Sequence, residues 1–319
     1  MKKTTYPYLR LSVTDQCNFN CFYCRPTLRA SLWTQKERLT FGEFTLLVEA
    51  LCRYGVRHVR LTGGEPLLKE NLSSFIKDLS SLPQLECLSL TTNGYHLSNF
   101  LQGDKEDGID KINISLDTLN AKRFIDLTGV DALESVREGI FRAQKKGIKK
   151  VKLNVVLIRG FNDDEISDFV DFGLRHQLDV RFIEYFPTRS KSEIFHGRFI
   201  PTSVVFAAIE ERFGRLEPLG KDRLSGPAQY FRIGKESSRI GFISSVTGFF
   251  CDDCNRIRLT CDGKLYPCLH SQEHTDLKRP LREGDKKGIF RLIAHALSNK
   301  KHYNKIICNR AFEMSEIGG

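Results

Sequence analysis

Hydrophobic residues in the first two thirds of the chain follow two alternating patterns. Short runs rich in Val, Ile and Leu predict buried strands, and longer segments with apolar residues every three or four positions predict helices. Strands are expected at residues 8–13, 56–61, 85–91, 109–116, 149–157 and 180–186. Helices are expected at residues 42–54, 72–82, 97–101, 132–146, 163–175 and 203–213.

This alternation implies parallel βα units joined by right-handed crossovers, so the expected fold class is α/β, as an open or closed barrel. In such barrels the chemistry lies at the C-terminal ends of the strands. Four successive predicted strands end in small polar or acidic residues: Thr14 and Asp15, Thr62 to Glu65, Thr92 to Gly94, and Ser115 with Asp117. We therefore expect the functional site at this end of the barrel.

The pattern changes after about residue 216. Residues 228–233 and 239–244 predict a β-hairpin, residues 251–268 form a compact segment with several cysteines, and residues 288–297 predict a helix. We therefore expect a partial α/β barrel over residues 1–215 and a second region over residues 216–319.

Composition is typical of a soluble globular protein, with 40% hydrophobic and 28% charged residues among 319. No apolar stretch is long enough to span a bilayer. The basic residues at the start of the chain are not followed by the apolar core of a signal peptide. The sequence therefore predicts a cytoplasmic protein with no membrane partner.

The formal net charge is +10, and a basic protein can bind nucleic acid, an acidic membrane or a polyphosphate. Many lysines, such as Lys145 and Lys146, lie in segments that predict exposed helices, where solvation accounts for them. No RNP, helix-turn-helix or basic-tail signature is present. Charge alone leaves nucleic acid open, as the less favoured partner.

Ten cysteines in a chain without an export signal favour metal binding over disulfides. Cys17, Cys21 and Cys24 form a C-x3-C-x2-C triplet. Three thiolates can hold three irons of a four-iron cluster, to which cysteine normally supplies all four ligands. The triplet therefore predicts a cluster with one iron open to another ligand. A zinc site or three structural thiols are the alternatives.

A second group contains Cys251, Cys254 and Cys268 and predicts another cluster with an open iron. A structural zinc ribbon with Cys261 as its fourth ligand is the alternative. Arg256 and Arg258 favour the cluster, because alternate residues of a strand point the same way and two guanidiniums form a strong phosphate site.

The first triplet, the adjacent Tyr23 and the Gly63-Gly64-Glu65-Pro66 turn together resemble the radical S-adenosylmethionine (SAM) superfamily. Glycines allow close backbone approach to a ligand, and the acidic residue can meet an ammonium group. In that superfamily three thiolates hold a [4Fe-4S] cluster and SAM chelates the fourth iron. An electron from the cluster splits SAM into methionine and a 5′-deoxyadenosyl radical.

The whole chain is similar to one family, the GTP 3′,8-cyclases of molybdenum cofactor biosynthesis. The matching segments are LRLSVTDQCNFNCFYC, VRLTGGEPLL, LTTNG, INISLD, VKLNVV, RFIEY, CDDCNRIRLTCDGKLYPCL and the terminal Gly-Gly. The resemblance implies an incomplete (β/α)6 TIM-type barrel with a C-terminal auxiliary iron–sulfur region. It implies a lyase in which the radical abstracts hydrogen from C3′ of GTP and the carbon radical attacks C8, giving (8S)-3′,8-cyclo-7,8-dihydroguanosine 5′-triphosphate.

The resemblance also implies roles for individual residues and two [4Fe-4S] clusters. Cys17, Cys21 and Cys24 would bind the SAM-cleaving cluster, and Cys251, Cys254 and Cys268 the auxiliary cluster, whose open iron takes the guanine of GTP. SAM contacts are implied for Tyr23, Gly64 and Ser115. GTP contacts are implied for Arg10, Arg60, Thr91, Lys152, Arg256 and Arg258, with Arg181 a further candidate.

The resemblance also bears on the last two residues of the chain, on Phe186 and on the partners. Gly318 and Gly319 would reach into the active site and assist catalysis. Phe186 stands where the family commonly has a methionine that contacts SAM. The partners implied are GTP, an electron donor such as flavodoxin or ferredoxin, the cyclic pyranopterin monophosphate synthase that acts next, and a second copy of the chain in a homodimer.

Two other functions stay open from the sequence. Another radical SAM enzyme with an auxiliary cluster, such as a peptide-modifying maturase, shares the first triplet, but such enzymes tend to have more C-terminal cysteines and to lack the Arg-x-Arg pair. A non-catalytic zinc and nucleic-acid-binding module would suit the basic charge.

Overall fold

Six parallel strands form the centre of the computed structural model, which describes residues 7–24, 33–102, 108–186, 197–220, 226–248, 254–269, 271 and 273–303. Each strand pairs in parallel with the next along the chain. The strands are β1 (Tyr8–Ser12), β2 (His58–Thr62), β3 (Cys87–Thr92), β4 (Lys111–Ser115), β5 (Lys150–Leu157) and β6 (Asp179–Glu184). Each overlaps one of the six predicted runs, so the α/β prediction is confirmed.

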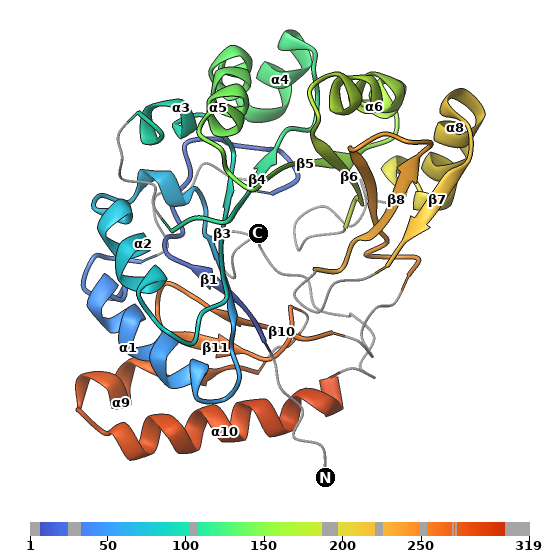
Figure 1. Ribbon diagram of the computed structural model, residues 1–319. Coiled ribbons are helices and arrows are strands. Elements are labelled where there is room, and N and C mark those ends of the chain that lie inside the picture. The colour runs from blue at the N-terminus through green and yellow to red at the C-terminus, as the bar shows by residue number, and fades with distance from the viewer. Residues whose placement is uncertain are drawn as a thin grey trace.

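Helices cover the outer face of this curved sheet (Figure 1). The six predicted helices are present as α1 (Phe41–Cys52), α2 (Leu72–Ser80), α3 (Leu97–Phe100), α5 (Leu133–Lys145), α6 (Ile166–Arg175) and α8 (Thr202–Phe213). Two short 3-10 turns precede α2 and α6, at Pro66–Leu68 and Asp163–Glu165. The sequence analysis missed α4 (Ala121–Thr128), although Asn120 caps it by accepting the amide of Arg123 at 3.1 Å and Gly129 ends it with φ 77°.

The C-terminal strands extend both edges of the same sheet, in the order β12-β11-β10-β1-β2-β3-β4-β5-β6-β9-β8-β7. These strands are β7 (Leu216–Leu219), β8 (Gln229–Ile233), β9 (Arg239–Ile243), β10 (Arg256–Leu259), β11 (Lys264–Tyr266) and β12 (Thr275–Asp276). The predicted hairpin is confirmed as β8 and β9, and β9 pairs in parallel with β6 while β10 pairs in parallel with β1. The sheet formed by the described strands does not close, so the barrel is incomplete.

Two helices follow the strands at the end of the described chain. They are α9 (Lys278–Arg282), which the sequence analysis missed, and α10 (Lys286–Tyr303), which is longer at both ends than the predicted helix 288–297. Figure 1 shows both helices beside α1 and β11. The strands of the second region join the sheet of the first. The division of the chain into two domains at residue 215 stays a prediction.

Side chains alternate along the strands between the helices and the inside of the curved sheet. In β1 and β2, Leu9, Leu11, Val59 and Leu61 are fully buried in the hydrophobic core. The residues between them, including Arg10 and Arg60, therefore point to the opposite, concave face. Polar residues continue across this face of the sheet, since Ser89 pairs in register with Arg60, Asn113 with Lys152, and Arg181 with Asn154.

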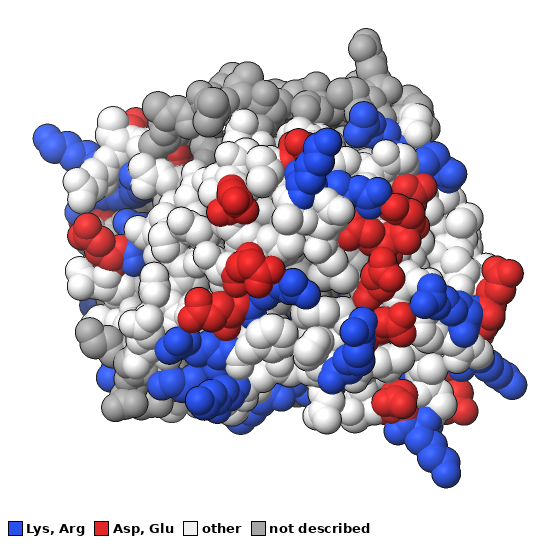
Figure 2. Space-filling view, turned by 90° about the horizontal axis from the view of Figure 1, so that it is seen from above, with Lys and Arg blue, Asp and Glu red and all other residues white. Residues whose placement is uncertain are grey.

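A small group of basic side chains lies inside the molecule rather than on its surface. Arg60, Lys152, Arg181 and Arg258 are all at most 9% exposed. On the face shown in Figure 2, basic and acidic side chains are interspersed over most of the surface, with one basic group near the lower left. Among the described helices, none combines the length and the apolar character needed to cross a bilayer.

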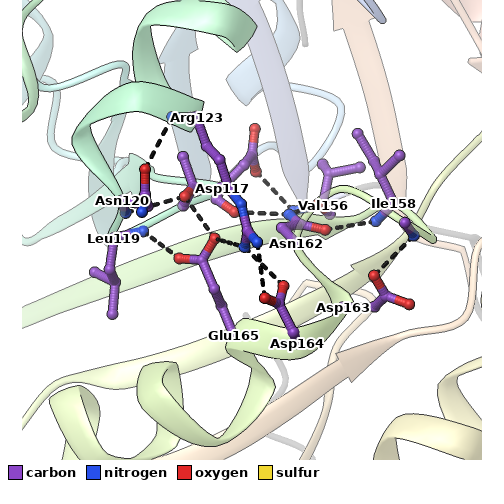
Figure 3. A network of polar contacts seen from close by, with 12 residues as sticks. Asp117, Leu119, Asn120, Arg123, Val156, Ile158, Asn162, Asp163, Asp164 and Glu165 are labelled. Carbon is purple, nitrogen blue, oxygen red and sulfur yellow. Dashed lines mark hydrogen bonds and ion pairs between the residues drawn. The ribbon is translucent and has the colours of Figure 1, made fainter.

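A polar network ties together the loops that follow β4 and β5 (Figure 3). The buried Glu165 carboxylate accepts hydrogen bonds from the Thr118 hydroxyl at 2.6 Å, the Leu119 amide at 2.6 Å and the Arg123 guanidinium at 2.8 Å. Asn162 donates to the carbonyl of Asp117 at 2.6 Å. The network therefore fixes the C-terminal ends of two neighbouring strands against each other.

Replacing Glu165 with alanine should destabilise the fold, because the buried Thr118 hydroxyl and Leu119 amide lose their acceptor. We expect Glu165→Ala to reduce the free energy of unfolding by roughly 3 kcal/mol, measured by urea denaturation of the metal-free protein. Glu134→Ala is the control, since its ion pair with Arg137 is exposed and should matter little. Equal unfolding midpoints for the two variants would contradict this role of Glu165.

Candidate active site

The first cysteine triplet lies on the loop that follows β1. Asp15, which opens this loop, is buried and pairs with Arg38 at 2.7 Å. The amide of Phe19 donates to the sulfur of Cys17 at 3.4 Å, and the amide of Cys24 donates to the carbonyl of Cys21 at 2.9 Å. Burial raises the pKa of Cys21 well above its usual value, and Cys24 and Cys17 raise it further, so the three thiols lie within electrostatic range of one another.

The glycine turn after β2 packs directly against this loop. Gly64 donates its amide to the Thr14 carbonyl at 2.7 Å, and Glu65 donates to the Gln16 carbonyl at 2.7 Å. A Cβ atom at Gly64 would lie 2.1 Å from the Gln16 carbonyl oxygen. Residue 64 must therefore be glycine for the turn after β2 to approach the cysteine loop this closely. This requirement holds whichever ligand Gly64 also contacts.

Glu65 connects two strand ends in the structure. Its fully buried carboxylate accepts hydrogen bonds from the Leu67 amide at 3.0 Å, the Thr92 hydroxyl at 2.8 Å and the Asn93 amide at 2.7 Å. Burial raises the pKa of Glu65 to about 7, and these hydrogen bonds oppose that rise. The carboxylate thus joins the ends of β2 and β3.

Tyr23 and Ser115, two of the predicted SAM-contacting residues, lie near the end of β4. The Tyr23 hydroxyl donates to Oδ2 of Asp117 at 2.6 Å, and Oδ1 of Asp117 accepts the Val156 amide at 2.7 Å. Burial raises the pKa of Asp117 to about 6 against the effect of these two hydrogen bonds. Ser115 is the last residue of β4 and pairs in register with Asn154 of β5. Asp117 therefore fixes the cysteine loop to the β4–β5 edge.

Three arginines occupy equivalent positions on adjacent strands. Arg10 of β1 is in register with Arg60 of β2 on one side and with Arg258 of β10 on the other. Neighbouring strands are about 4.8 Å apart, so the side chains of this row start close together. Burial lowers the pKa of Arg10 well below its usual value, and Arg258, Arg60 and Arg256 lower it further. Such a row favours a bound polyanion.

Lys152 and Thr91 continue the polar lining. Arg60 donates to the Thr91 hydroxyl at 3.2 Å and also to the Tyr8 hydroxyl. Nζ of Lys152 donates to the Tyr230 hydroxyl at 2.8 Å and lies 3.7 Å from Asp179. Burial lowers the pKa of Lys152 to about 6, and Arg181 lowers it as well, while Asp179 opposes them.

Several buried polar atoms of the concave face have no hydrogen-bond partner among the described residues. They are Nε and Nη2 of Arg181 and the side-chain oxygens of Asn113 and Asn154. Gly241, opposite Arg181 in register, leaves room for it, because a Cβ there would lie 2.8 Å from Cγ of Arg181. These atoms fit a ligand with both acceptor and donor groups, as a nucleotide has.

The second cysteine group lies where β10 and β11 meet. Cys254 and Cys268 are partly buried, and Cys251 lies outside the described residues. Burial raises the pKa of Cys254, but the nearby Arg256 and Lys300 outweigh it and lower that pKa to about 7. A stabilised thiolate is the form that binds metal, so this donor chemistry fits an iron–sulfur cluster.

Cys261 lies apart from the predicted metal-binding thiols of the second cysteine group. It is buried in the hydrophobic core with its sulfur 4.0 Å from Asp15, and burial raises its pKa to about 12. Cys52 is also in the core, and burial raises its pKa to about 11. Within the part of the chain that the structure describes, no three His, Cys, Asp or Glu side chains are grouped as for a single metal ion.

Two predicted features remain without a structural test. Gly318 and Gly319 lie outside the described residues. Phe186, which follows β6, packs with Leu269 against Tyr266 of β11, on the side of the second cysteine group.

Sequence reasoning missed several residues that support the site. Glu184, at the end of β6, accepts hydrogen bonds from the amides of Thr202 at 3.0 Å, Val246 at 2.7 Å and Thr247 at 2.9 Å. It therefore holds the segment that leads toward the second cysteine group. Tyr230 lies between two cations, with Lys152 and Arg239 4.6 and 4.5 Å from its ring centre. Only the position of Glu184 at a strand end could have indicated its role.

The chain matches two sequence families. Residues 11–173 match the family described as Radical SAM superfamily, and residues 178–306 match the family described as Molybdenum Cofactor Synthesis C. A GTP 3′,8-cyclase from Pelotomaculum thermopropionicum is 40% identical over 315 residues, which cover 98% of this chain and 97% of that protein. A GTP 3′,8-cyclase from Peptoclostridium acidaminophilum is 42% identical over 315 residues, covering 98% of this chain and 95% of the relative.

Solved structures with a similar fold are more distant in sequence. Streptococcus suis SuiB bound to S-adenosylmethionine matches with a TM-score of 0.60 at 14% identity, over 91% of this chain and 68% of SuiB. The protein anSMEcpe with bound AdoMet matches with a TM-score of 0.59 at 14% identity, over 93% of this chain and 78% of that protein. These similarities concern the fold alone.

Alkylation can test the environment of Cys254. In the reduced, metal-free protein, iodoacetamide should label Cys254 half-maximally near pH 7, because the thiolate reacts and forms as the pH rises through the pKa. Peptide mass spectrometry after timed labelling measures this profile. Cys261 is the internal control and should stay unlabelled over the same range. The same pH profile for both residues would rule out the proposed stabilisation of the Cys254 thiolate.

Proposed function

The chain belongs to the GTP 3′,8-cyclase family within the radical SAM superfamily, and we propose that its concave face binds GTP between two iron–sulfur clusters. The product would be (8S)-3′,8-cyclo-7,8-dihydroguanosine 5′-triphosphate, formed for molybdenum cofactor biosynthesis. The observation that carries this proposal is the row of Arg258, Arg10 and Arg60, three cations in register on adjacent strands.

Cys17, Cys21 and Cys24 would hold the first [4Fe-4S] cluster. When SAM is bound there, SAM and the cluster together supply a radical that removes hydrogen from the substrate. Gly64, Ser115 and Tyr23 would contact SAM, and Tyr23 is held in place by its hydrogen bond to Asp117. The Glu65 and Asp117 hydrogen bonds keep these elements in a fixed arrangement, which a reaction between two bound molecules requires.

Cys254 and Cys268, together with Cys251 outside the described residues, would hold the second [4Fe-4S] cluster. Its open iron would take the guanine of GTP. Arg256 and Arg258 follow Cys254 in the run CNRIR and point to the concave face with Arg10, since Arg258 is in register with it. The guanine and the phosphates of one GTP molecule would therefore contact neighbouring parts of β10.

The triphosphate would lie against Arg10, Arg60, Arg256, Arg258 and Lys152, with Thr91 as a hydroxyl donor beside Arg60. We add Arg181 to this set, because two of its buried nitrogens have no hydrogen-bond partner among the described residues. Anionic oxygens would satisfy these donors and relieve the repulsion between the cations.

The remaining parts of the proposal concern partners and location. A flavodoxin or ferredoxin would supply electrons, and the cyclic pyranopterin monophosphate synthase would take the product. The enzyme would act in the cytoplasm, and as a homodimer if it follows other members of the family. Gly318 and Gly319 would assist catalysis from the end of the chain.

Anaerobic incubation of the reconstituted protein with SAM, a reductant and GTP tests this function. We expect 5′-deoxyadenosine and a cyclised product with the mass of GTP, both identified by chromatography and mass spectrometry. Arg258→Met should lower the product yield by at least tenfold, because it removes a buried cation from the row. The exposed Arg279→Met on α9 is the control. SAM cleavage that GTP neither accelerates nor diverts into this product would exclude the proposed substrate.

The pKa of Lys152 predicts a pH dependence of GTP binding. With a pKa of about 6, Lys152 is mostly neutral above that pH in the free protein, whereas bound phosphates favour the ammonium form. GTP binding should therefore take up a proton at Lys152. The contribution of Lys152 to the affinity for GTP should fall by up to about tenfold per pH unit above 6. Anaerobic calorimetry in two buffers of different ionisation enthalpy measures the uptake.

Lys152→Arg is the matched variant, because a guanidinium stays charged over this range. It should lose the part of the proton uptake that comes from residue 152. Identical proton uptake by the unaltered protein and the variant would show that Lys152 is already charged before GTP binds.

A further inference from the structure

Lys300 is a buried cation beside the second cysteine group. It lies on α10 and is 1% exposed, among the least exposed side chains of the described chain. Its Nζ donates to the Arg256 carbonyl at 2.6 Å and the Pro267 carbonyl at 2.6 Å, and lies 3.8 Å from the sulfur of Cys254. An ammonium group has three hydrogens, and these three acceptors can take all of them.

The two carbonyl groups belong to the two arms that carry the cysteines. Arg256 is two residues after Cys254, and Pro267 directly precedes Cys268. One ammonium therefore connects both arms and also binds one of the sulfur atoms. The contact brings the last described helix against β10 and β11, which are paired antiparallel.

Hydrophobic packing alone does not explain a lysine at this position. A buried ammonium loses its hydration, which is costly unless hydrogen bonds and negative charge compensate. Backbone carbonyls and a thiolate supply both here. The exposed Lys286 and Lys287 at the start of the same helix show that α10 can carry lysines without burying them.

We propose that Lys300 is a positioning residue for the second iron–sulfur cluster: it holds the arms of Cys254 and Cys268 together and places a positive charge against the cluster. This inference rests on the proposed second cluster. A cation close to an iron–sulfur cluster stabilises the reduced, more negative form, and hydrogen bonds to the sulfurs act in the same direction. Lys300 therefore raises the reduction potential of this cluster and keeps its ligands in place.

The test uses the full chain with Cys17, Cys21 and Cys24 all replaced by alanine, so that any cluster belongs to the second group. After anaerobic reconstitution, iron content and the midpoint potential in an EPR-monitored redox titration are measured. Lys300→Met removes the charge and keeps the length of the side chain, and Lys300→Arg keeps the charge. Lys287→Met is the matched control, an exposed lysine of the same helix.

We expect about four irons in the parent chain, a more negative midpoint potential in Lys300→Met, and a potential close to that of the parent in Lys300→Arg and Lys287→Met. Loss of iron from Lys300→Met that Lys300→Arg restores, with unchanged circular dichroism, would also support the proposal. Parental iron content and potential in Lys300→Met would overturn it, as would iron loss from both Lys300 variants. A parent chain without iron would instead refute the second cluster itself.

Discussion

Parallel strand pairing places Arg258, Arg10 and Arg60 side by side in the interior, and much of the molecule is arranged around this repulsive row. Like charges at this separation oppose folding unless neighbouring groups or a ligand compensate. The Tyr8 and Thr91 hydroxyls accept from Arg60, and the thiols of Cys254 and Cys268 raise the pKa of Arg258 against the effects of burial and Arg256. Hydroxyls and thiols are thus among the internal partners of these cations, and a bound polyanion would add the opposite charge.

The ends of the strands are held by buried acidic side chains. Glu65 joins β2 to β3, Asp117 joins the cysteine loop to β5, Glu165 joins the β4 and β5 loops, and Glu184 joins β6 to the segment after β9. All four accept backbone amides. The cysteine loop is thereby fixed by its neighbours, so that its geometry does not depend on the loop alone.

Most of the fold could be predicted from the sequence because the six strands and six helices have strong apolar periodicity. It also placed Arg256 and Arg258 on one strand, which β10 confirms. Periodicity could not indicate that β10 pairs with β1 and β9 with β6, because such pairing depends on contacts between distant segments. Nor could it identify Lys300 or Tyr230, since a lysine or tyrosine in an amphipathic segment has the same local signature whether it faces water or a cation site.

The pairing of β1 with β10 has a consequence for the order in which the molecule can be assembled. One strand begins at residue 8 and the other at residue 256, so β1 is synthesised well before β10. The parallel strands β1 to β6 can pair while translation continues, since their contacts are sequential. Arg258 and the second cysteine group can join them only after β10 has been synthesised. Until then the interior lacks both the third arginine of the row and the second group of thiols.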